Sequence, residues 1–185
     1  MSEDQIIASP MTEADGPDFK IIELLFFAYR DFVSDADVVL EEYGFGRAHH
    51  RVLHFVNRNP GLTVAHLLEI LGITKQSLGR VLRQLVASGH MVQRPGPADK
   101  RQRLLFPTQN GRNLALKLSA IQTRRINNAV QGKNREIDPA IAVFLTNMVG
   151  PSGQQRMKEL NCNTESAKSV SQATGAATEL SAKGS

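Results

Sequence analysis

The most informative stretch of the sequence, residues 72–111, reads GITKQSLGRVLRQLVASGHMVQRPGPADKRQRLLFPTQNG. Thr74 is a good N-cap for a helix that runs to about Ser88. Four apolar residues recur at i, i+3, i+4 and i+7 and share one face of this helix: Leu78, Val81, Leu82 and Leu85. The opposite face carries Lys75, Gln76, Gly79, Arg80 and Arg83. The pattern predicts a helix with one face in the core and a polar, basic face toward solvent.

A second short helix lies just before it in the sequence, and a tight turn separates the two helices. Thr63 can cap this helix, three leucines supply its apolar stripe, and Gly72 ends it. Two short helices joined at Gly72 and Ile73, the second showing solvent a stripe of Gln, Lys and Arg, are typical of a helix-turn-helix. Arg and Gln suit the base edges of the major groove. Thr or Ser at the helix N-terminus can help to hold a phosphate.

The residues after Gly89 change in character. Residues 90–94 and 103–106 predict two strands, and Pro95, Gly96 and Pro97 predict the turn between them. Lys100 and Arg101 at the tip of such a wing can enter the minor groove. Asp99 would repel phosphate, so we expect it to orient the guanidinium of Arg101. The candidate DNA-contacting residues are therefore Thr74, Lys75, Gln76, Ser77, Arg80, Arg83, Arg94, Asp99, Lys100, Arg101 and Arg103.

Positive charge is concentrated in this part of the chain. Residues 74–103 hold seven Lys or Arg and one Asp, a net charge of +6, whereas the other residues hold 15 basic and 17 acidic side chains. A local basic patch on a nearly neutral body is the footprint expected of phosphate binding at one surface. Basic residues on a single amphipathic helix are often only a solvated face. The adjacent wing is a second, independent feature that favours nucleic acid.

The flanking segments predict long helices. Residues 19–42 contain no Pro and are apolar around more than one face, which predicts burial by their own domain and by a second copy. Residues 47–57 predict another helix, and residues 108–150 predict long amphipathic helices of a size used for dimerisation. Residues 1–18 and 151–185 are poor in large apolar residues, and we expect a disordered leader and tail. The fold class is mainly α with a small β-hairpin wing.

Residues 72–111 resemble the MarR family of bacterial winged helix-turn-helix transcriptional regulators. The resemblance covers about residues 19–150 and is most specific in the Asp99-x-Arg101 wing and the Thr108-x-x-Gly111 helix start. It implies a homodimer with interlocking N- and C-terminal helices, a DNA-binding lobe at about residues 47–107, and a pseudo-palindromic operator. A small-molecule effector is typical of the family. Pro107 departs from the family pattern and should shorten the second wing strand.

Three histidines form a separate cluster in the sequence. His50 and His54 have the i, i+4 spacing that lets two imidazoles share Zn²⁺, and His49 is adjacent. No nearby Cys or carboxylate pair completes a ligand set, so we predict no metal site and no cofactor. Packing, hydrogen bonding or the lining of an effector pocket is the preferred interpretation for His49, His50 and His54.

The remaining sequence features narrow the function class. Cys162 is the single cysteine and lies in the predicted tail, which favours a reducing compartment and leaves a redox-sensing thiol unsupported. The first residues lack the pattern of a signal peptide, and we expect a cytoplasmic protein. Phosphate-binding, hydrolase and zinc-protease motifs are absent from the sequence, so an enzyme is not expected. The alternative to a DNA-binding regulator is a winged helix that docks protein.

Overall fold

The computed structural model describes residues 10–130 and 138–160. The helices are α1 (Phe19–Glu41), α2 (Arg47–Arg58), α3 (Val64–Leu71), α4 (Lys75–Ala87), α5 (Gln109–Val130) and α6 (Pro139–Met148), with a 3-10 turn, η1, at Glu13–Asp15. The strands are β1 (Leu62–Thr63), β2 (Met91–Pro95) and β3 (Arg103–Pro107). The predicted mainly α, winged helix-turn-helix fold is confirmed.

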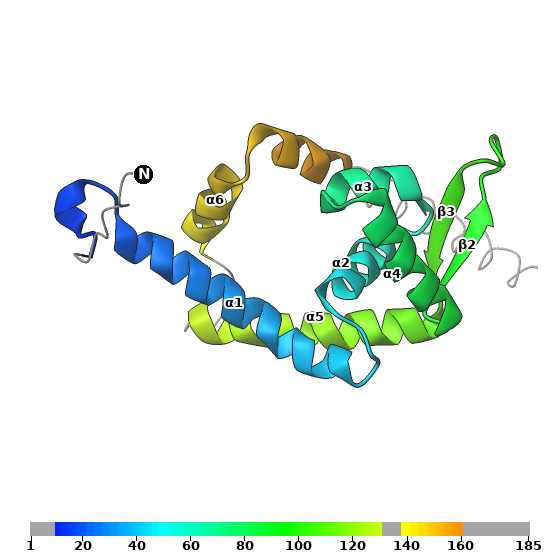
Figure 1. The fold of residues 1–185 in the computed structure, drawn as a ribbon, viewed down its shortest axis with the longest axis horizontal. Helices are drawn as coiled ribbons and strands as arrows, with labels where there is room; N and C mark the ends of the chain where they lie inside the picture. The colour runs from blue at the N-terminus through cyan, green and yellow to red at the C-terminus, as the bar shows by residue number, and fades with distance from the viewer. Residues whose placement is uncertain (1–9, 131–137, 161–185) are drawn as a thin grey trace, which may run out of the picture.

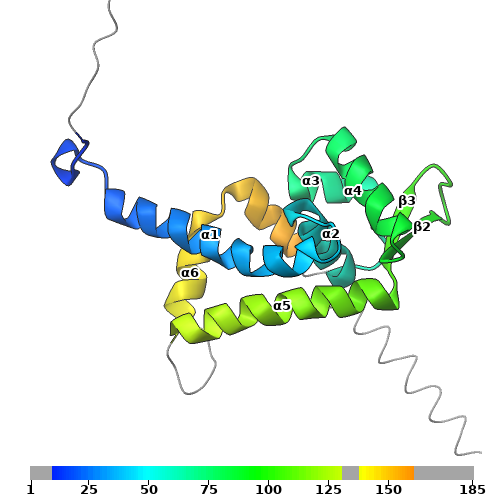
Figure 2. The same ribbon diagram turned by 60° about the horizontal axis from the view of Figure 1, so that its bottom comes forward.

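The two long helices form the base of the molecule. α1 and α5 lie side by side in Figures 1 and 2, and α2, α3, α4 and the strands form a lobe at one end of them. Asp18 caps α1 by accepting a hydrogen bond from the amide of Ile21 at 3.0 Å. The loop from α1 to α2 turns at Gly44, whose φ of +67° lies in the left-handed region that favours glycine.

A three-stranded antiparallel sheet carries the wing. The strand order is β1-β3-β2, with Met91 opposite Pro107 and Pro95 opposite Arg103. β1 was not predicted: it is two residues long and pairs Leu62 with Leu105 of β3. Pro107 does not shorten the second wing strand as expected: it pairs with Met91 as the last residue of β3, and the amide of Thr108 beyond it donates to the carbonyl of His90 at 3.2 Å.

Buried apolar side chains, mostly leucines, form the core of the lobe. The largest fully buried side chains include Leu40, Leu53, Leu67, Leu78, Leu85, Leu105 and Leu118. They come from α1 to α5 and β3, so the core ties the lobe to both long helices. Burial of apolar surface on this scale is the main favourable term in folding.

The start of α5 closes against the base of the wing, which explains the Thr-x-x-Gly motif. The hydroxyl of Thr108 donates to the carbonyl of Gly89 at 2.6 Å and accepts from the amide of Gly111 at 3.1 Å. A Cβ at Gly111 would collide with the carbonyl oxygen of His90. Only glycine allows this approach of the helix to the strand.

The chain ends differ in part from the prediction. Residues 151–160 are helical, although a disordered tail was predicted from residue 151. Pro151 is well suited to the first turn of a helix, and Gln, Arg, Met, Lys, Glu and Leu follow, all good helix formers. The predicted leader contains the turn η1 at its C-terminal end. Residues 1–9, 131–137 and 161–185, including Cys162 and part of the predicted helical segment 108–150, lie outside the described residues.

Candidate nucleic-acid interface

Helix α4 begins and ends where its sequence pattern predicts. Gly72 ends α3 in the left-handed conformation with φ +61°. The Oγ1 of Thr74 accepts a hydrogen bond from the amide of Ser77 at 3.2 Å and caps α4. The helix then buries its four predicted core residues: Leu78, Val81, Leu82 and Leu85. The turn and the buried face together present the opposite face of α4 to solvent.

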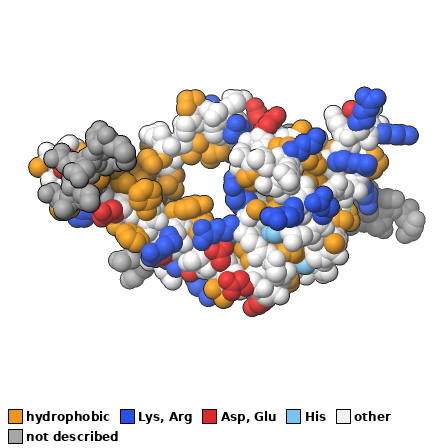
Figure 3. Space-filling view, in the orientation of Figure 1, with side chains coloured by type: hydrophobic (Ala, Val, Ile, Leu, Met, Phe, Trp, Pro, Cys, Tyr) orange, Lys and Arg blue, Asp and Glu red, His pale blue; other side chains and the backbone are white. Residues whose placement is uncertain are grey.

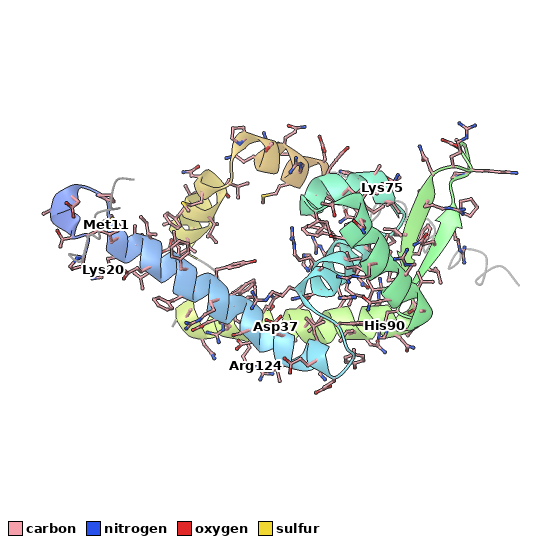
Figure 4. The ribbon with its side chains drawn as sticks, in the orientation of Figure 1. Met11, Lys20, Asp37, Lys75, His90 and Arg124 are labelled. Atoms are coloured by element: carbon pink, nitrogen blue, oxygen red, sulfur yellow. The ribbon has the colours of Figure 1, made fainter. Side chains whose placement is uncertain are left out.

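The outer face of α4 is open. Its predicted contact residues are all exposed: Thr74, Lys75, Gln76, Ser77, Arg80 and Arg83. Within the described part of the chain, none of the three cations on this face is in a salt bridge. Figure 4 places Lys75 at the start of α4, far from His90, which follows the other end of that helix. The N-terminal half of α4 is therefore free to enter a groove.

The wing is a tight hairpin shaped by backbone hydrogen bonds. The amide of Gly96 donates to the carbonyl of Gln102 at 3.0 Å, and the amide of Gln102 donates to the carbonyl of Asp99 at 3.1 Å. The carboxylate of Asp99 accepts a hydrogen bond from the main-chain N–H of Arg101 at 2.8 Å. The expectation that Asp99 orients the guanidinium of Arg101 was wrong, because the carboxylate caps the turn instead.

Helix α4 and the wing border one groove on the protein surface, with a volume of about 680 Å³. Lys75 and Gly79 of α4 line it on one side, and Asp99, Arg101 and Arg103 line it on the wing side. In Figure 3, Lys and Arg side chains project from the wing at the upper right of the molecule. Of the predicted cations, Lys75 of α4 and Arg101 and Arg103 of the wing thus border the same groove, whereas Arg80, Arg83 and Lys100 do not line it.

Two glutamines that were not predicted also line this groove, Gln93 and Gln102. Gln93 lies opposite Leu105, which faces the core, so strand alternation puts its side chain on the lobe side of the sheet. The period of two in β2 and β3 could have identified Gln93. Gln102 lies in the turn, where no such periodicity applies.

Arg94 is not brought into this groove. It pairs with Leu104, one register step from Gln93, and therefore lies on the other face of the sheet. Its guanidinium carbon lies 5.8 Å from the centre of the Phe106 ring, within cation–π range. This position does not support its predicted role in contacting DNA beside α4.

Comparison with known proteins agrees with this arrangement. The model of the MarR family matches residues 43–102. The HTH-type transcriptional regulator PetP of Rhodobacter capsulatus is 43% identical over 141 residues, which cover 76% of this chain and 85% of PetP. The chain belongs to the MarR family. It is thus a DNA-binding transcriptional regulator by family.

Solved structures of MarR proteins share the fold at low sequence identity. A MarR protein from Peptoclostridium difficile has a TM-score of 0.62 at 17% identity, covering 85% of this chain and 99% of its own. The regulator SlyA has a TM-score of 0.59 at 19% identity, covering 69% and 90%. CouR, a repressor solved bound to a 23-mer DNA duplex, has a TM-score of 0.58 at 20% identity, covering 77% and 99%.

Two of the three histidines singled out in the sequence line a second cavity. It has a volume of about 260 Å³ between α1, α2 and α5, and its lining includes Tyr29, Phe32, His50, Arg51 and His54. Burial lowers the pKa of His50, and the nearby His54 lowers it further, while Asp37 opposes the shift. Burial and then Arg58 lower the pKa of His54. Both imidazoles therefore favour their neutral forms.

Arg51 connects this cavity to the helix-turn-helix. It lines the cavity, and its Nη2 donates a hydrogen bond to the carbonyl of Leu71 at 2.7 Å. Leu71 is the last residue of α3, directly before the turn to α4. A guanidinium at this end also satisfies a carbonyl that the helix leaves open.

His49 does not line the cavity, contrary to the prediction that grouped it with His50 and His54. It is 8% exposed and packs in the lobe against Phe45, with ring centroids 4.7 Å apart. Consecutive helix residues point about 100° apart, so His49 and His50 face different neighbours.

Within residues 10–130 and 138–160, no group of three His, Cys, Asp or Glu could hold a metal ion. In the same ranges no helix is long and apolar enough to cross a membrane.

Proposed function

We propose that this regulator reads a pseudo-palindromic operator with two copies of α4 in successive major grooves. The observation that carries this is the single groove bordered by Lys75 and by the wing cations Arg101 and Arg103. Arg80 and Gln76 lie on the exposed face of α4 and suit guanine and adenine edges. Arg101 at the wing suits the narrow minor groove beside them. Such a function requires a protein of the cytoplasm.

The proposed dimer uses apolar surface that one copy leaves exposed. α6 has no buried residue, and Phe144 and Leu145 are 45% and 54% exposed. On α1, Phe26 and Phe27 are 71% and 54% exposed. Figure 3 shows hydrophobic side chains gathered near the N-terminal half of α1 and α6, around the opening in the molecule. Apolar patches of this kind mark association surfaces, so we propose that a second copy covers them.

Binding to DNA across a salt series tests the proposed function. The purified protein is titrated with a duplex from its own promoter region and with random duplex. Binding to the promoter that stays about 10³-fold tighter or more, with both affinities falling as salt rises, supports a specific regulator. Weak and equal binding to both duplexes contradicts it and favours the protein-docking winged helix.

The oligomeric state tests the dimer separately. Light scattering should give twice the chain mass for the natural protein. Phe26→Asp and Phe144→Asp should shift it toward a monomer, because each would bury a charge in the interface. Val86→Glu on α4 is the control, since the side chain of Val86 is 39% exposed and belongs to the DNA-binding lobe. A dimer that survives both α1 and α6 variants contradicts this assignment of the interface.

A small molecule in the cavity between α1, α2 and α5 is the proposed effector. Its lining combines aromatic side chains with His50, His54 and Arg51. A ligand there touches both the dimerisation helices and the DNA-binding lobe, so it would change the spacing of the two recognition helices, set at roughly 34 Å by one turn of DNA. Its effect is limited to its differential affinity for the two spacings. Operator affinity that is unchanged by every compound that binds the cavity would remove this part of the proposal.

A further inference from the structure

A cluster of rings, buried except for Tyr43, joins the loop after α1 to the DNA-binding lobe. Phe45 of the loop stacks on His49 of α2 at 4.7 Å with an interplanar angle of 9°. Phe45 and Tyr43 also contact His90, edge to face, with centroids 5.2 and 5.6 Å away. His49 and His90 are each 8% exposed. His90 directly precedes β2, so the cluster connects the end of α1 with the base of the wing.

His49 uses both of its ring nitrogens inside this cluster. The backbone N–H of Gly46 donates to Nδ1 at 3.1 Å, so Nδ1 carries no proton. The proton of the neutral ring is then on Nε2, which donates to Oε1 of Gln84 at 2.8 Å. One side chain thereby caps the start of α2 and holds a residue of α4, 35 positions further along the chain.

The bond to Gln84 constrains α4 in a way that its leucines do not. Apolar packing is non-directional, so a small rotation of α4 about its axis keeps most of its buried area. A hydrogen bond at 2.8 Å depends on distance and angle and penalises such a rotation. Gln84 lies one helical turn after Arg80, on the same side of α4. A rotation that breaks the bond therefore also moves the Arg80 guanidinium relative to the bases.

We propose that His49 is a positioning residue for the recognition helix. Through Gln84 it sets the rotation of α4, and through Phe45 it relates that rotation to the loop that leaves α1. The bond improves discrimination between operator and other DNA and leaves the charge that attracts phosphate unchanged. This inference rests on the proposed reading of DNA by α4.

The test uses the full chain and the tightest-binding duplex that it selects from a random pool. Gln84→Met removes the acceptor from an exposed position and leaves the core intact. His49→Asn keeps an oxygen for the Gly46 amide but is too short to reach Gln84. Gln109→Met, at an exposed residue of α5, is the control for the change of side chain. Affinity for the selected duplex and for random duplex is measured across salt, together with the melting temperature.

We expect weaker discrimination between the two duplexes, with an unchanged electrostatic attraction to DNA. Gln84→Met should reduce the ratio of the two affinities about fivefold, the worth of one hydrogen bond, with the same salt slope as the natural protein. The double variant His49→Asn/Gln84→Met should discriminate no worse than the poorer single variant, because both break one bond. Gln109→Met should discriminate like the natural protein.

Three outcomes overturn the proposal. Unchanged discrimination by Gln84→Met shows that the bond does not position α4. Equal losses on both duplexes that follow the melting temperature show a role in stability alone. If the natural protein itself fails to discriminate between duplexes, the proposed function fails first and the inference fails with it. The first two results contradict only the role of His49 and do not affect the proposed function. A failure of this inference can therefore be told apart from a failure of the proposed function.

Discussion

The carboxylate of Asp35 on α1 accepts two hydrogen bonds from the guanidinium of Arg125 on α5, at 2.6 and 2.8 Å. This bidentate pair joins two residues that are 90 positions apart in the sequence. A planar guanidinium and a carboxylate match in shape, which makes such a pair both directional and strong. It links the two long helices of the base at their partly exposed side, in addition to their core contacts.

Removal of this pair should destabilise the protein in a pH-dependent way. The hydrogen bond from Arg125 lowers the pKa of Asp35 from its ordinary value of 3.8, so the stabilisation is present above that value and is lost as pH falls through the lowered pKa. Asp35→Asn should therefore melt at a lower temperature than the natural protein near neutral pH and should approach it at acid pH. Thermal melts from pH 7 to pH 2.5 measure this. Glu41→Gln makes the same change of charge on α1, and a loss equal to that of Asp35→Asn would contradict the assignment.

Substitution of Gly111 should cost far more than substitution of another helical glycine. A Cβ at Gly111 meets the carbonyl oxygen of His90, and a clash of this kind costs about 1–3 kcal/mol or more. A Cβ at Gly79 of α4 meets nothing within 4 Å. Gly79→Ala should therefore stabilise the helix by about 0.5–1 kcal/mol. Chemical denaturation of the two variants measures both changes, and two changes of the same sign would refute the close-contact explanation.

Acidification should weaken the fold through the cavity histidines. Burial holds the pKa of His50 and of His54 below the ordinary 6.5, so the unfolded chain binds protons that the folded chain does not. Stability is then greatest above that value and falls as pH drops through the lowered pKa values. His50→Gln and His54→Gln should each reduce the loss of melting temperature between pH 8 and pH 5. Phe32→Leu alters the same cavity without a titrating group and should keep the full loss; full pH dependence in both Gln variants would contradict the prediction.

Arginines at different places of the interface should affect DNA binding differently. Arg80→Ala should cost about 1–3 kcal/mol and relax specificity at one base position. Arg101→Ala should weaken binding mainly at A·T-rich flanks, where the minor groove is narrow. Arg94→Ala should have the smallest effect, because Arg94 lies on the face of the sheet with Phe106. Binding to a panel of single-base variants of the operator measures all three, and equal losses on every sequence would contradict the roles of Arg80 and Arg101.

Local chemistry predicted most of the fold and the main site elements. Thr74 and Gly72 mark the ends of their helices because capping and the left-handed conformation depend on the residue itself and its nearest neighbours. The apolar stripe of α4 has the helical period, so its buried face could be read directly. Pro95, Gly96 and Pro97 predicted the turn of the wing for the same reason.

Interactions between distant residues decided the rest. β1 exists because Leu62 pairs with Leu105, and two residues carry no strand pattern of their own. The sequence spacing groups His49 with His50, but the hydrogen bond of His49 to Gln84, 35 positions further along the chain, places His49 in the lobe. The carboxylate of Asp99 accepts a hydrogen bond from the backbone N–H of Arg101 and not from a guanidinium, because the turn brings that N–H within reach. The helices and the wing were predictable because periodicity, capping and turn residues act over a few neighbouring residues, and the basic segment can be read directly from the chain. Contacts between polar side chains were not, because a hydrogen bond requires atoms to lie within about 3 Å of one another, and folding sets that distance.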